Sequence, residues 1–427
     1  MLDIRALRED PESTRAALGR RGDPALGEAL DRALAFDRER REILGEVEAL
    51  KAERNDVSRR IGDRKRAGEE ADDLIAAMGE VAGRIKGLDG RLSEVDDGLR
   101  STLLAIPNAP DERVPPGGEG DFEIVAEWGT PAGSPEEGGV PHWDTGEALG
   151  VLDLERGARV AGSGFPLLVG QGARLSRGLV QFMLDLHTGE HGYTEVAPPF
   201  LVNREALVGT GQLPKFEEDL YRTDADDLFL VPTAEVPVTN LHAGELLSEA
   251  DLPIAYVAYT PCFRREAGAA GRDTRGMLRV HQFDKVELVR LVTPESAAEQ
   301  LELLTRHAET VLERLELAHR RILIAAGDLG FSNALTYDLE VWSPGVGRWL
   351  EVSSCSSYTD YQARRADLRY RPGGGGKPRH LHTLNGSGVA LARTIVALLE
   401  TRREADGSVT MPDALRPYVG FERIGSM

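Results

Sequence analysis

The sequence is poor in cysteine and has no long apolar run. Its 427 residues include two cysteines, Cys262 and Cys355, too few for a disulfide framework or a four-thiolate zinc site. No stretch approaches the ~20 consecutive apolar residues of a membrane-spanning helix. The N-terminus, MLDIRALREDPEST, carries early acids where a signal peptide would be apolar. We therefore expect a cytoplasmic protein with no membrane partner, no structural zinc and two packed cysteines.

Basic residues are fewer than acidic ones. The chain has 51 Lys and Arg against 71 Asp and Glu, a net charge of -20, which argues against indiscriminate binding to nucleic acid, so we expect no DNA partner. The exception is residues 51–66, with seven basic residues against three acidic ones. The seven are Lys51, Arg54, Arg59, Arg60, Arg64, Lys65 and Arg66. A phosphate backbone would bind most naturally to this basic segment.

The basic segment lies where two heptad patterns meet. Apolar residues recur at spacings of three and four over residues 43–61, with Arg54 interrupting one core position, and again over 74–99, as in a coiled-coil seam. The only break expected between them contains Gly62, Gly68 and the acidic pair that follows Gly68. We predict an antiparallel helical hairpin, about 50 Å long for ~35 residues per helix, with the basic segment at its tip. The same spacing is also found in oligomerisation coiled coils with a solvated charged face.

The composition changes after the second heptad pattern. Residues 105–120 contain four prolines and three glycines, which indicates a domain boundary. We predict a helical arm at residues 1–108 and a larger domain at 109–427. In the larger domain, helices expected at 174–187 and 294–315 are interspersed with short strands without the rhythm of a βαβ array. The predicted fold class is therefore α+β: a helical hairpin followed by a mixed, mostly antiparallel sheet flanked by helices.

The segment 261–287 carries the densest set of polar groups. It is typical of two strands joined by a loop rich in Gly and Arg. Alternation predicts Arg264 and Glu266 on one face of the first strand, and Phe283, Lys285 and Glu287 on one face of the second. An arginine suits a phosphate or carboxylate and an aromatic ring suits a nucleobase, so this surface could hold a nucleotide beside an amino acid. The alternative is a β-hairpin with a solvated, salt-bridged face.

Three further segments offer ligands. In VPTAEVP, Thr233 and Glu235 would share one side of a strand, although an ordinary surface strand fits equally. In WLEVSSCSS, Glu351 and Ser354 supply hard oxygen ligands, which suit Mg²⁺ shared with phosphates better than zinc. TLNGSGVALARTIVALLE is typical of a Gly-containing turn entering a helix, with Arg393 about two turns inside. Free backbone N–H groups there would bind an anion, but a simple helix start fits as well.

These motifs together resemble a known enzyme family. The spacing Phe-Arg-x-Glu, loop, His-x-Phe resembles motif 2 of class II aminoacyl-tRNA synthetases, in the form found in seryl-tRNA synthetases. The loop contains Gly268, Gly271, Arg272, Arg275 and Gly276. GYTEVAPPFLV at 192–202, which we expect to be an extended strand, resembles motif 1, and the segment before Arg393 resembles motif 3. With the hairpin, the Thr-Ala-Glu and the Glu-x-x-Ser, the resemblance follows family order over nearly the whole chain.

The resemblance implies an ATP-dependent serine–tRNA ligase. Such an enzyme converts serine to seryl-adenylate and transfers it to the 3′ end of tRNA(Ser) and, in this family, of tRNA(Sec). It implies Mg²⁺ with ATP as the cofactor, and an arm whose seven basic residues grip the long variable arm of the tRNA. Motif 1 implies a homodimer, in which the arm of one subunit serves the active site of the other.

The resemblance also assigns the site residues. Arg264, on the α-phosphate, and Arg393, on the γ-phosphate, are the implied catalytic residues, and Glu351 with Ser354 the implied metal ligands. Glu266 would accept a hydrogen bond from the adenine amino group, and Phe283 would stack on its ring. The implied serine-binding residues are Thr233, Ala234, Glu235, Glu287 and Ser387. The implied ATP-binding residues are Arg264, Arg265, Glu266, Val280, Phe283, Glu351, Val352, Ser353, Ser354 and Arg393.

The chain departs from the family in two places. Ala392 stands where Gly is frequent, and ETRREADGS at 400–408 replaces a stretch bearing Asn or Gln in many bacterial members. These changes bear on turnover or inhibitor sensitivity rather than on reaction class.

Three alternatives to a housekeeping ligase differ from it in the motifs that each would keep. A ligase that loads an amino acid onto a carrier protein would keep the adenylating residues, but related proteins of that kind lack the hairpin. A non-catalytic scaffold would be expected to lose Arg264, Glu351 or Arg393, and all three are present. A duplicated, inhibitor-resistant isoform that still charges tRNA would keep every motif, so that alternative stays open.

Overall fold

The structure is a computed structural model that describes residues 1–131, 133–267 and 275–425. The contacts within the chain divide it into two compact units. The helical unit comprises Met1–Gly19 and Asp23–Pro107, and the sheet unit comprises Arg20–Gly22 and Asn108–Met427. Three residues near the N-terminus therefore belong to the sheet unit, although the chain on both sides of them belongs to the helical unit.

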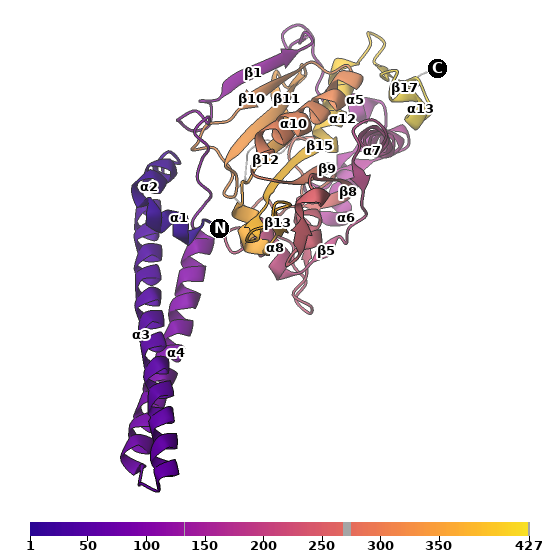
Figure 1. The fold of residues 1–427 in the computed structure, drawn as a ribbon. Coiled ribbons are helices and arrows are strands. Elements are labelled where there is room, and N and C mark those ends of the chain that lie inside the picture. Colours follow the sequence, from indigo (N-terminus) through magenta and orange to yellow (C-terminus); the bar gives the residue numbers. More distant parts are fainter. Residues whose placement is uncertain (132, 268–274, 426–427) are drawn as a thin grey trace. The chain divides into compact units, whose positions relative to one another are not determined.

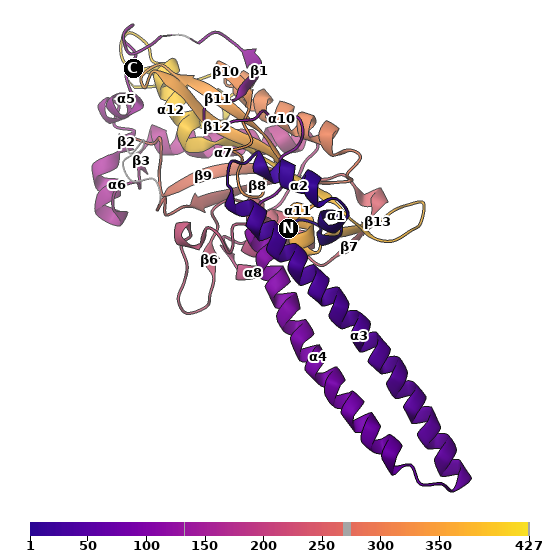
Figure 2. The ribbon, with the colours of Figure 1, turned by 90° about the vertical axis from the view of Figure 1, so that its left-hand side faces the viewer.

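Two long helices, α3 (Ala25–Ala67) and α4 (Asp72–Ala105), dominate the helical unit and run side by side in Figure 2. Two short helices, α1 (Ile4–Glu9) and α2 (Pro11–Gly19), precede them. The buried clusters join Ile43 and Val47 to Val95, Leu50 to Val81 and Ile85, and Val57 and Ile61 to Leu74. Early residues of one seam thus meet late residues of the other, so the predicted antiparallel hairpin is confirmed.

The turn of the hairpin is set by one glycine. Gly68 caps the C-terminal end of helix α3, and its left-handed φ of 76° costs glycine little because it has no Cβ. Gly62, in contrast, lies inside α3. Helix α3 has 43 residues and α4 has 34. At 1.5 Å per residue these lengths correspond to about 65 Å and about 50 Å.

In the described part of the sheet unit, the main sheet has eight strands in the order β1-β10-β11-β12-β15-β9-β8-β4. All neighbours pair antiparallel except β4, which pairs parallel with β8. The strands are β1 (Glu123–Trp128), β4 (Thr194–Glu195), β8 (Ile254–Phe263), β9 (Gln282–Val292), β10 (His319–Leu323), β11 (Leu335–Ser343), β12 (Arg348–Ser357) and β15 (His382–Ala390). The predicted mixed, mostly antiparallel sheet is confirmed.

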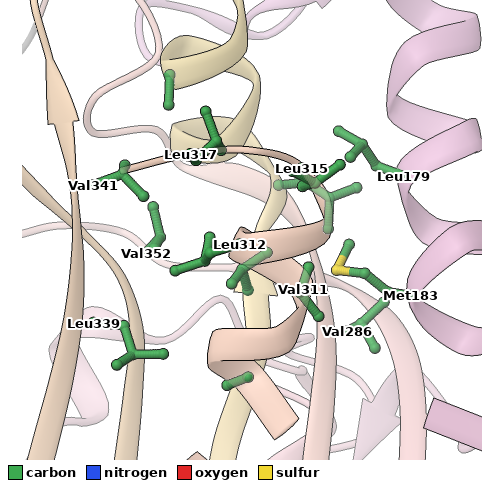
Figure 3. Close-up of a cluster of buried hydrophobic side chains, with 14 of the residues drawn as sticks. Leu179, Met183, Val286, Val311, Leu312, Leu315, Leu317, Leu339, Val341 and Val352 are labelled. Carbon is green, nitrogen blue, oxygen red and sulfur yellow. The ribbon is translucent and has the colours of Figure 1, made fainter. Parts of the chain in front are cut away.

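One face of this sheet is covered by three amphipathic helices, α7 (Gln171–Gly189), α10 (Ala297–Arg314) and α12 (Leu391–Thr401). Figure 1 shows α10 and α12 lying across the strands. In Figure 3, Leu312 of α10 points toward Leu339 and Val352 of the strands, and Met183 of α7 approaches Val286. Each such side chain contributes about 1.5–3 kcal/mol by leaving water. Helices α7 and α10 confirm the two helices predicted from periodicity.

The opposite face of the same strands is polar. Because successive side chains of a strand point to opposite faces, positions that alternate with the core residues turn away from the helices. They include Lys285 and Glu287 on β9, Thr336 and Asp338 on β11, Ser354 and Ser356 on β12, and Asn385 and Ser387 on β15. The sheet therefore presents a hydrogen-bonding surface assembled from four strands.

The strand predicted at 192–202 is wrong in its extent. It is split into β4, on the edge of the main sheet, and β5 (Leu201–Val202), which pairs with β6 (Phe229–Leu230) in a separate small sheet. Pro198 and Pro199 lie between the two parts, and proline has no N–H to donate to a ladder. The described helices contain no segment long and apolar enough to cross a bilayer.

The remaining elements of the sheet unit are short. They are α5 (His142–Ala148), β2 (Leu152–Asp153), α6 (Leu154–Ala161), β3 (Leu167–Leu168), α8 (Arg204–Thr210), η1 (Glu217–Asp219), α9 (Glu235–Thr239), η2 (Asn240–His242), β7 (Leu246–Ser248), η3 (Glu249–Asp251), α11 (Tyr361–Ala366), β13 (Arg369–Arg371), β14 (Arg379–His380), β16 (Val409–Thr410), α13 (Arg416–Val419) and β17 (Arg423–Ile424).

Candidate active site

Two neighbouring cavities lie against the polar face of the sheet. The first, about 360 Å³, is lined mainly by β9, β12, β15 and the start of α12, and we call it the sheet cavity. The second, about 540 Å³, is lined mainly by loops that include residues 210–212 and 330–333, and we call it the loop cavity. The two share Thr233, Glu235, Arg264, Glu266, Arg279, Asn333 and Tyr358. They therefore form one continuous candidate site.

Twelve of the residues proposed from the sequence for serine, ATP or metal binding line the sheet cavity. They are Thr233, Glu235, Arg264, Glu266, Val280, Phe283, Glu287, Glu351, Val352, Ser354, Ser387 and Arg393. They come from separate parts of a chain stretch of more than 150 residues, and the sheet brings them together. Their convergence is the geometric requirement of a shared substrate site.

Three proposed residues do not line either cavity. Ala234 is fully buried in an apolar cluster. Arg265 donates from Nη1 to the carbonyl oxygen of Glu218 at 3.0 Å. Ser353 points to the other side of its strand, and its Oγ donates to the carbonyl oxygen of Ser387 at 2.6 Å. The side chains of these three residues therefore lie outside both cavities, and their roles in ligand binding stay predictions.

Arg264 and Phe283 form one end of the sheet cavity. The guanidinium carbon of Arg264 lies 5.2 Å from the centre of the Phe283 ring, a cation–π distance, and its Nε donates to the Pro232 carbonyl at 3.3 Å. Among the described residues, the other Arg264 nitrogens have no hydrogen-bond partner, so they could bind an anion beside the ring. The predicted strand face is wrong in detail, because β8 ends one residue before Arg264 and Glu266 has a left-handed φ of 52°. Of the loop that follows, Gly268, Gly271 and Arg272 lie outside the described residues.

A buried acidic cluster forms the other end. Glu287 and Lys285 are 2% and 7% exposed and make an ion pair, and the Thr233 hydroxyl donates to Glu287 Oε2 at 3.2 Å. Glu235 accepts from Gln362 Nε2 at 2.7 Å. Burial, and then the charge of Glu287, raise the pKa of Glu235 to about 7. Because the two carboxylates share a single lysine, a further cation bound at this end of the cavity would be stabilised.

The predicted strand for the Thr-Ala-Glu sequence is wrong. The strand β6 ends at Leu230, and Glu235 is the first residue of helix α9. The Glu235 N–H donates to Thr233 Oγ1 at 3.2 Å, so a turn rather than strand alternation holds the two side chains on the same side. This turn still presents both of them to the cavity.

A β-bulge brings Glu351 and Ser354 to the same face of β12. Leu339 of β11 pairs with Ser353, whereas the next residue, Glu340, pairs with Glu351, so Val352 is an extra residue. Residues three apart on a regular strand point to opposite faces, and one extra residue reverses that relation. The bulge therefore explains why both predicted metal ligands line the sheet cavity.

Asp338, which the sequence analysis missed, lines neither cavity but lies next to a predicted metal ligand. It pairs with Ser354 across the β11–β12 ladder, and its Oδ1 is buried with no hydrogen-bond partner among the described residues. Burial, and then the charge of Glu351, raise the pKa of Asp338 well above its usual range. An unsatisfied carboxylate oxygen beside Glu351 and Ser354 is a set of hard oxygen donors that fits Mg²⁺.

Arg393 lies beside Glu351, but not by the predicted route. The segment predicted as a glycine turn is strand β15, and Arg393 is the third residue of α12 rather than two turns inside it. Its Nη1 donates to the Glu351 carbonyl at 2.6 Å and its Nε to the Leu278 carbonyl at 3.1 Å. Gly386 serves packing, because a Cβ there would meet Cys355 Sγ at 2.8 Å. Ala392, the departure from the family pattern, also lines the cavity.

Other residues missed from the sequence stabilise the acidic end. The Tyr358 hydroxyl donates to Asn385 Oδ1 at 3.0 Å, and Thr383 Oγ1 donates to Gln362 Oε1 at 2.6 Å. Asn385 stands two residues before Ser387 on the same strand, so alternation could have found it. Nothing in the local sequence marks Gln362, whose role depends on its contact with Glu235.

The basic segment lies on α3 in the helical unit. Six of its seven basic side chains are exposed, and Arg64 is partly buried. Arg59, Arg64 and Arg66 pair with Asp56, Asp73 and Asp63 at 2.7–2.9 Å. For Lys51, Arg54, Arg60 and Lys65 the described residues provide no recorded ion pair. Four exposed cations on one helix remain available to an anionic partner.

Comparisons with known proteins agree with this geometry. Two family models match: the seryl-tRNA synthetase N-terminal domain at residues 1–110, and the tRNA synthetase class II core domain (G, H, P, S and T) at residues 215–402. A serine–tRNA ligase of Gemmatimonas aurantiaca is 54% identical over 421 residues, which cover 98% of this chain and 99% of the relative. One of Pelobacter propionicus is 52% identical over 426 residues, covering 99% and 100%.

Solved structures give the same result. The seryl-tRNA synthetase from Pyrococcus horikoshii, complexed with ATP, is 39% identical with a TM-score of 0.94, and the match covers 100% of both chains. The cytoplasmic serine–tRNA ligase from Naegleria fowleri, in complex with AMP, is 28% identical with a TM-score of 0.89, covering 99% of this chain and 98% of that one. With both units matched and the motif residues gathered in one cavity, the chain belongs to the seryl-tRNA synthetase family.

Proposed function

We propose that this protein activates L-serine with ATP and transfers the seryl group to the 3′ end of tRNA(Ser), and also of tRNA(Sec). The observation that carries the proposal is the single cavity in which an arginine and an aromatic ring face a buried acidic cluster. An adenylate needs an anion clamp and a base platform at one end, and an amino acid needs a carboxylate for its ammonium at the other. Members of this family are ATP-dependent aminoacyl-tRNA ligases.

In the first step, a carboxylate oxygen of serine attacks the α-phosphorus of ATP. The new P–O bond forms as the bond to the bridging oxygen of the β-phosphate breaks, and pyrophosphate leaves with that electron pair. Arg264 binds the α-phosphate, Phe283 stacks on adenine, and Glu266 accepts from the adenine amino group. Serine attacks as a carboxylate, so no general base is required, and acceleration comes from positioning and charge neutralisation.

The acidic end holds serine. Glu235 binds the ammonium, and Thr233, Glu287 and Ser387 complete the contacts to the ammonium and hydroxyl. Glu287 is already ion-paired with Lys285, which leaves Glu235 as the carboxylate with an unmatched charge. A buried polar group whose partner is missing costs free energy, so alanine is rejected for its missing hydroxyl and threonine for its extra methyl group.

Glu351 and Ser354 would hold Mg²⁺, and we add Asp338 to this set because its Oδ1 has no hydrogen-bond partner among the described residues. No group of three His, Cys, Asp or Glu side chains within the described ranges forms a complete metal site. Mg²⁺ is commonly shared between protein oxygens, phosphate oxygens and water, so a bound ion would supply charge neutralisation for the phosphates of ATP. Arg393 would add a second positive charge on the same side of the cavity.

In the second step, the terminal ribose hydroxyl of tRNA attacks the adenylate carbonyl and AMP leaves. We assign tRNA binding to the arm, residues 1–108, through Lys51, Arg54, Arg59, Arg60, Arg64, Lys65 and Arg66, and aminoacylation to residues 109–427. RNA recognition by shape and phosphate contacts fits an arm of this kind. We further propose a cytoplasmic homodimer in which each arm serves the partner subunit's active site.

Amino-acid-dependent ATP–pyrophosphate exchange tests the proposed function. We expect serine to support exchange, and alanine and threonine to give kcat/KM values at least about 100-fold lower. Charging of a tRNA(Ser) transcript then separates this proposal from a carrier-protein ligase, which would form the adenylate without charging tRNA. Equal exchange with alanine, or exchange without any tRNA charging, would contradict the assignment.

The pKa of Glu235 predicts the pH dependence of serine binding. Because the raised pKa is about 7, the carboxylate gains its charge as the pH rises through 7, and only the charged form binds the ammonium strongly. We expect the KM for serine in the exchange reaction to fall roughly tenfold from about pH 6 to about pH 8. Glu235→Gln should raise this KM by about 100-fold and remove the pH dependence.

The control for this prediction is Glu205→Gln, a substitution of an exposed glutamate on α8. It removes one negative charge from the same unit and should leave both the KM and its pH dependence unchanged. A pH dependence that persists in Glu235→Gln would assign the titration to another group.

A further inference from the structure

Arg21 is a cation of the sheet unit that lies, in sequence, between helices α2 and α3 of the helical unit. Its Nε donates to the Asn108 carbonyl at 2.7 Å. Its Nη1 donates to the carbonyls of Leu329 at 2.9 Å and Gly330 at 3.3 Å, and its Nη2 to those of Gly330 at 3.3 Å and Asn333 at 2.6 Å. Every acceptor recorded for it within the described residues is a main-chain oxygen.

This arrangement needs arginine rather than any cation. The guanidinium is planar and has five N–H donors in a fixed fork, so it can bind several carbonyls at once, whereas lysine acts as a point charge. Burial lowers the pKa of Arg21 to about 10, still well above neutral pH, so the group stays charged. Burying this charge is costly, and the carbonyl oxygens offset the cost by accepting its hydrogen bonds.

The carbonyls that Arg21 binds belong to a wall of the candidate site. Residues 330–333 line the loop cavity, and Asn333 lines both cavities. The Asn333 side chain donates to Thr336 Oγ1 and to Ser356 Oγ, both at 2.8 Å, and Ser356 lines the sheet cavity. On the other side, Ser332 Oγ donates to the Thr210 carbonyl at 3.1 Å. Arg21 therefore fixes the main chain from which these contacts start.

We propose that Arg21 is a positioning residue for the amino-acid end of the active site, acting by holding residues 330–333 so that Asn333 and Ser356 keep their places in the cavity wall. The inference rests on the proposed function, because it names serine as the substrate whose binding depends on this wall. Arg21 does not line either cavity, so its effect is indirect.

Arg20 provides a matched control in the same segment. It also donates to main-chain carbonyls, with Nη1 to Asp111 at 3.0 Å and Nη2 to Val114. Asp111 and Val114 line neither cavity. The two arginines thus differ in whether their acceptors belong to the site wall.

The test compares Arg21→Met and Arg20→Met in the full-length chain, with kcat and KM for serine and for ATP measured by pyrophosphate exchange, and Tm measured for each. We expect Arg21→Met to raise the KM for serine about tenfold and to leave the KM for ATP within about twofold, because Ser356, which Asn333 contacts, pairs across the ladder with Asn385 of the acidic end. Arg20→Met should leave both KM values within about twofold, even where its Tm falls.

An unchanged KM for serine in folded Arg21→Met, or equal increases in both variants that follow their loss of Tm, would overturn the proposal and make Arg21 purely structural. If Arg21→Met does not fold, Arg21→Lys replaces it. The lysine can reach only part of the carbonyl set, so an intermediate KM for serine is expected, and a wild-type KM with a lowered Tm would overturn the proposal. Absence of serine-dependent exchange in the unmodified protein would instead overturn the proposed function.

Discussion

Replacing residues 31–100 with a short Gly/Ser turn is expected to lower kcat/KM for tRNA(Ser) charging by at least about 10³-fold, because most of the affinity for nucleic acid comes from phosphate contacts. All seven basic residues of the segment 51–66 are removed. Serine-dependent pyrophosphate exchange should stay within about threefold of the full-length value, since the residues that line the sheet cavity are untouched. The deletion keeps Arg20–Gly22, which belong to the sheet unit.

A charge-matched pair of variants separates the basic segment from the arm as a whole. Lys51→Ala with Arg54→Ala removes two exposed cations from the predicted tRNA-binding segment, and Arg32→Ala with Arg38→Ala removes two exposed cations from the other end of α3. We expect the first pair to weaken tRNA charging about tenfold or more and to reduce its salt dependence, and the second pair to have little effect.

The deletion of residues 31–100 has its own contradicting outcome. If the shortened protein kept both tRNA charging and pyrophosphate exchange at the full-length rates, the arm would have another role.

Arg264→Ala is expected to reduce kcat for pyrophosphate exchange by about 10³- to 10⁴-fold. Removing one neutral donor to a developing charge typically costs 10²- to 10³-fold, and Arg264 supplies a full charge beside Phe283. A loss of 10³-fold corresponds to about 4 kcal/mol of transition-state stabilisation. Unfolding monitored by circular dichroism should be nearly unchanged, because within the described part of the chain the Arg264 side chain makes one hydrogen bond, to the Pro232 carbonyl.

The Arg265→Ala variant tests a residue for which the structure and the sequence motif predict different effects. The motif implies that Arg265 contacts ATP, whereas its side chain donates to the Glu218 carbonyl and lines neither cavity. The structure therefore predicts exchange activity within about threefold of the unmodified protein. A loss comparable to that of Arg264→Ala would mean that Arg265 turns into the cavity when ATP binds.

The order of the family motifs along the chain predicts the residues of this site better than the local secondary-structure pattern does. Thr233, Glu235 and Arg393 line the predicted cavity although the local structure expected for each is wrong. The segment before Arg393 has glycines typical of a turn, yet it is a strand, because β9 and β12 pair with it from distant parts of the sequence. Tertiary pairing overrides the weak strand preference of glycine. A family motif reflects the folded structure of its members, so it includes the effect of such strand pairing. The secondary-structure propensity of a single residue type does not.

Alternation is reliable where a strand is regular and fails where it is not. It correctly places Phe283, Lys285 and Glu287 together on β9. It does not predict that Glu351 and Ser354 share a face, because that depends on the extra residue in the β11–β12 register. Asp338 is missed for the same reason, since its neighbour Ser354 is known only from the pairing of two strands.

The hydrogen bonds from Arg21 to main-chain carbonyls far along the chain have a consequence for protein synthesis. Its acceptors at Leu329 and Asn333 lie 308 and 312 residues further along the chain, so at ~5–20 residues per second the ribosome delivers them about 15–60 s later. Helices α1 to α4 find their partners within the first 107 residues and can form in that interval. A nascent chain abandoned before residue 330 would thus have a complete helical unit and lack part of the wall of the candidate site. Under the function proposed for the arm, such a chain would bind tRNA without charging it.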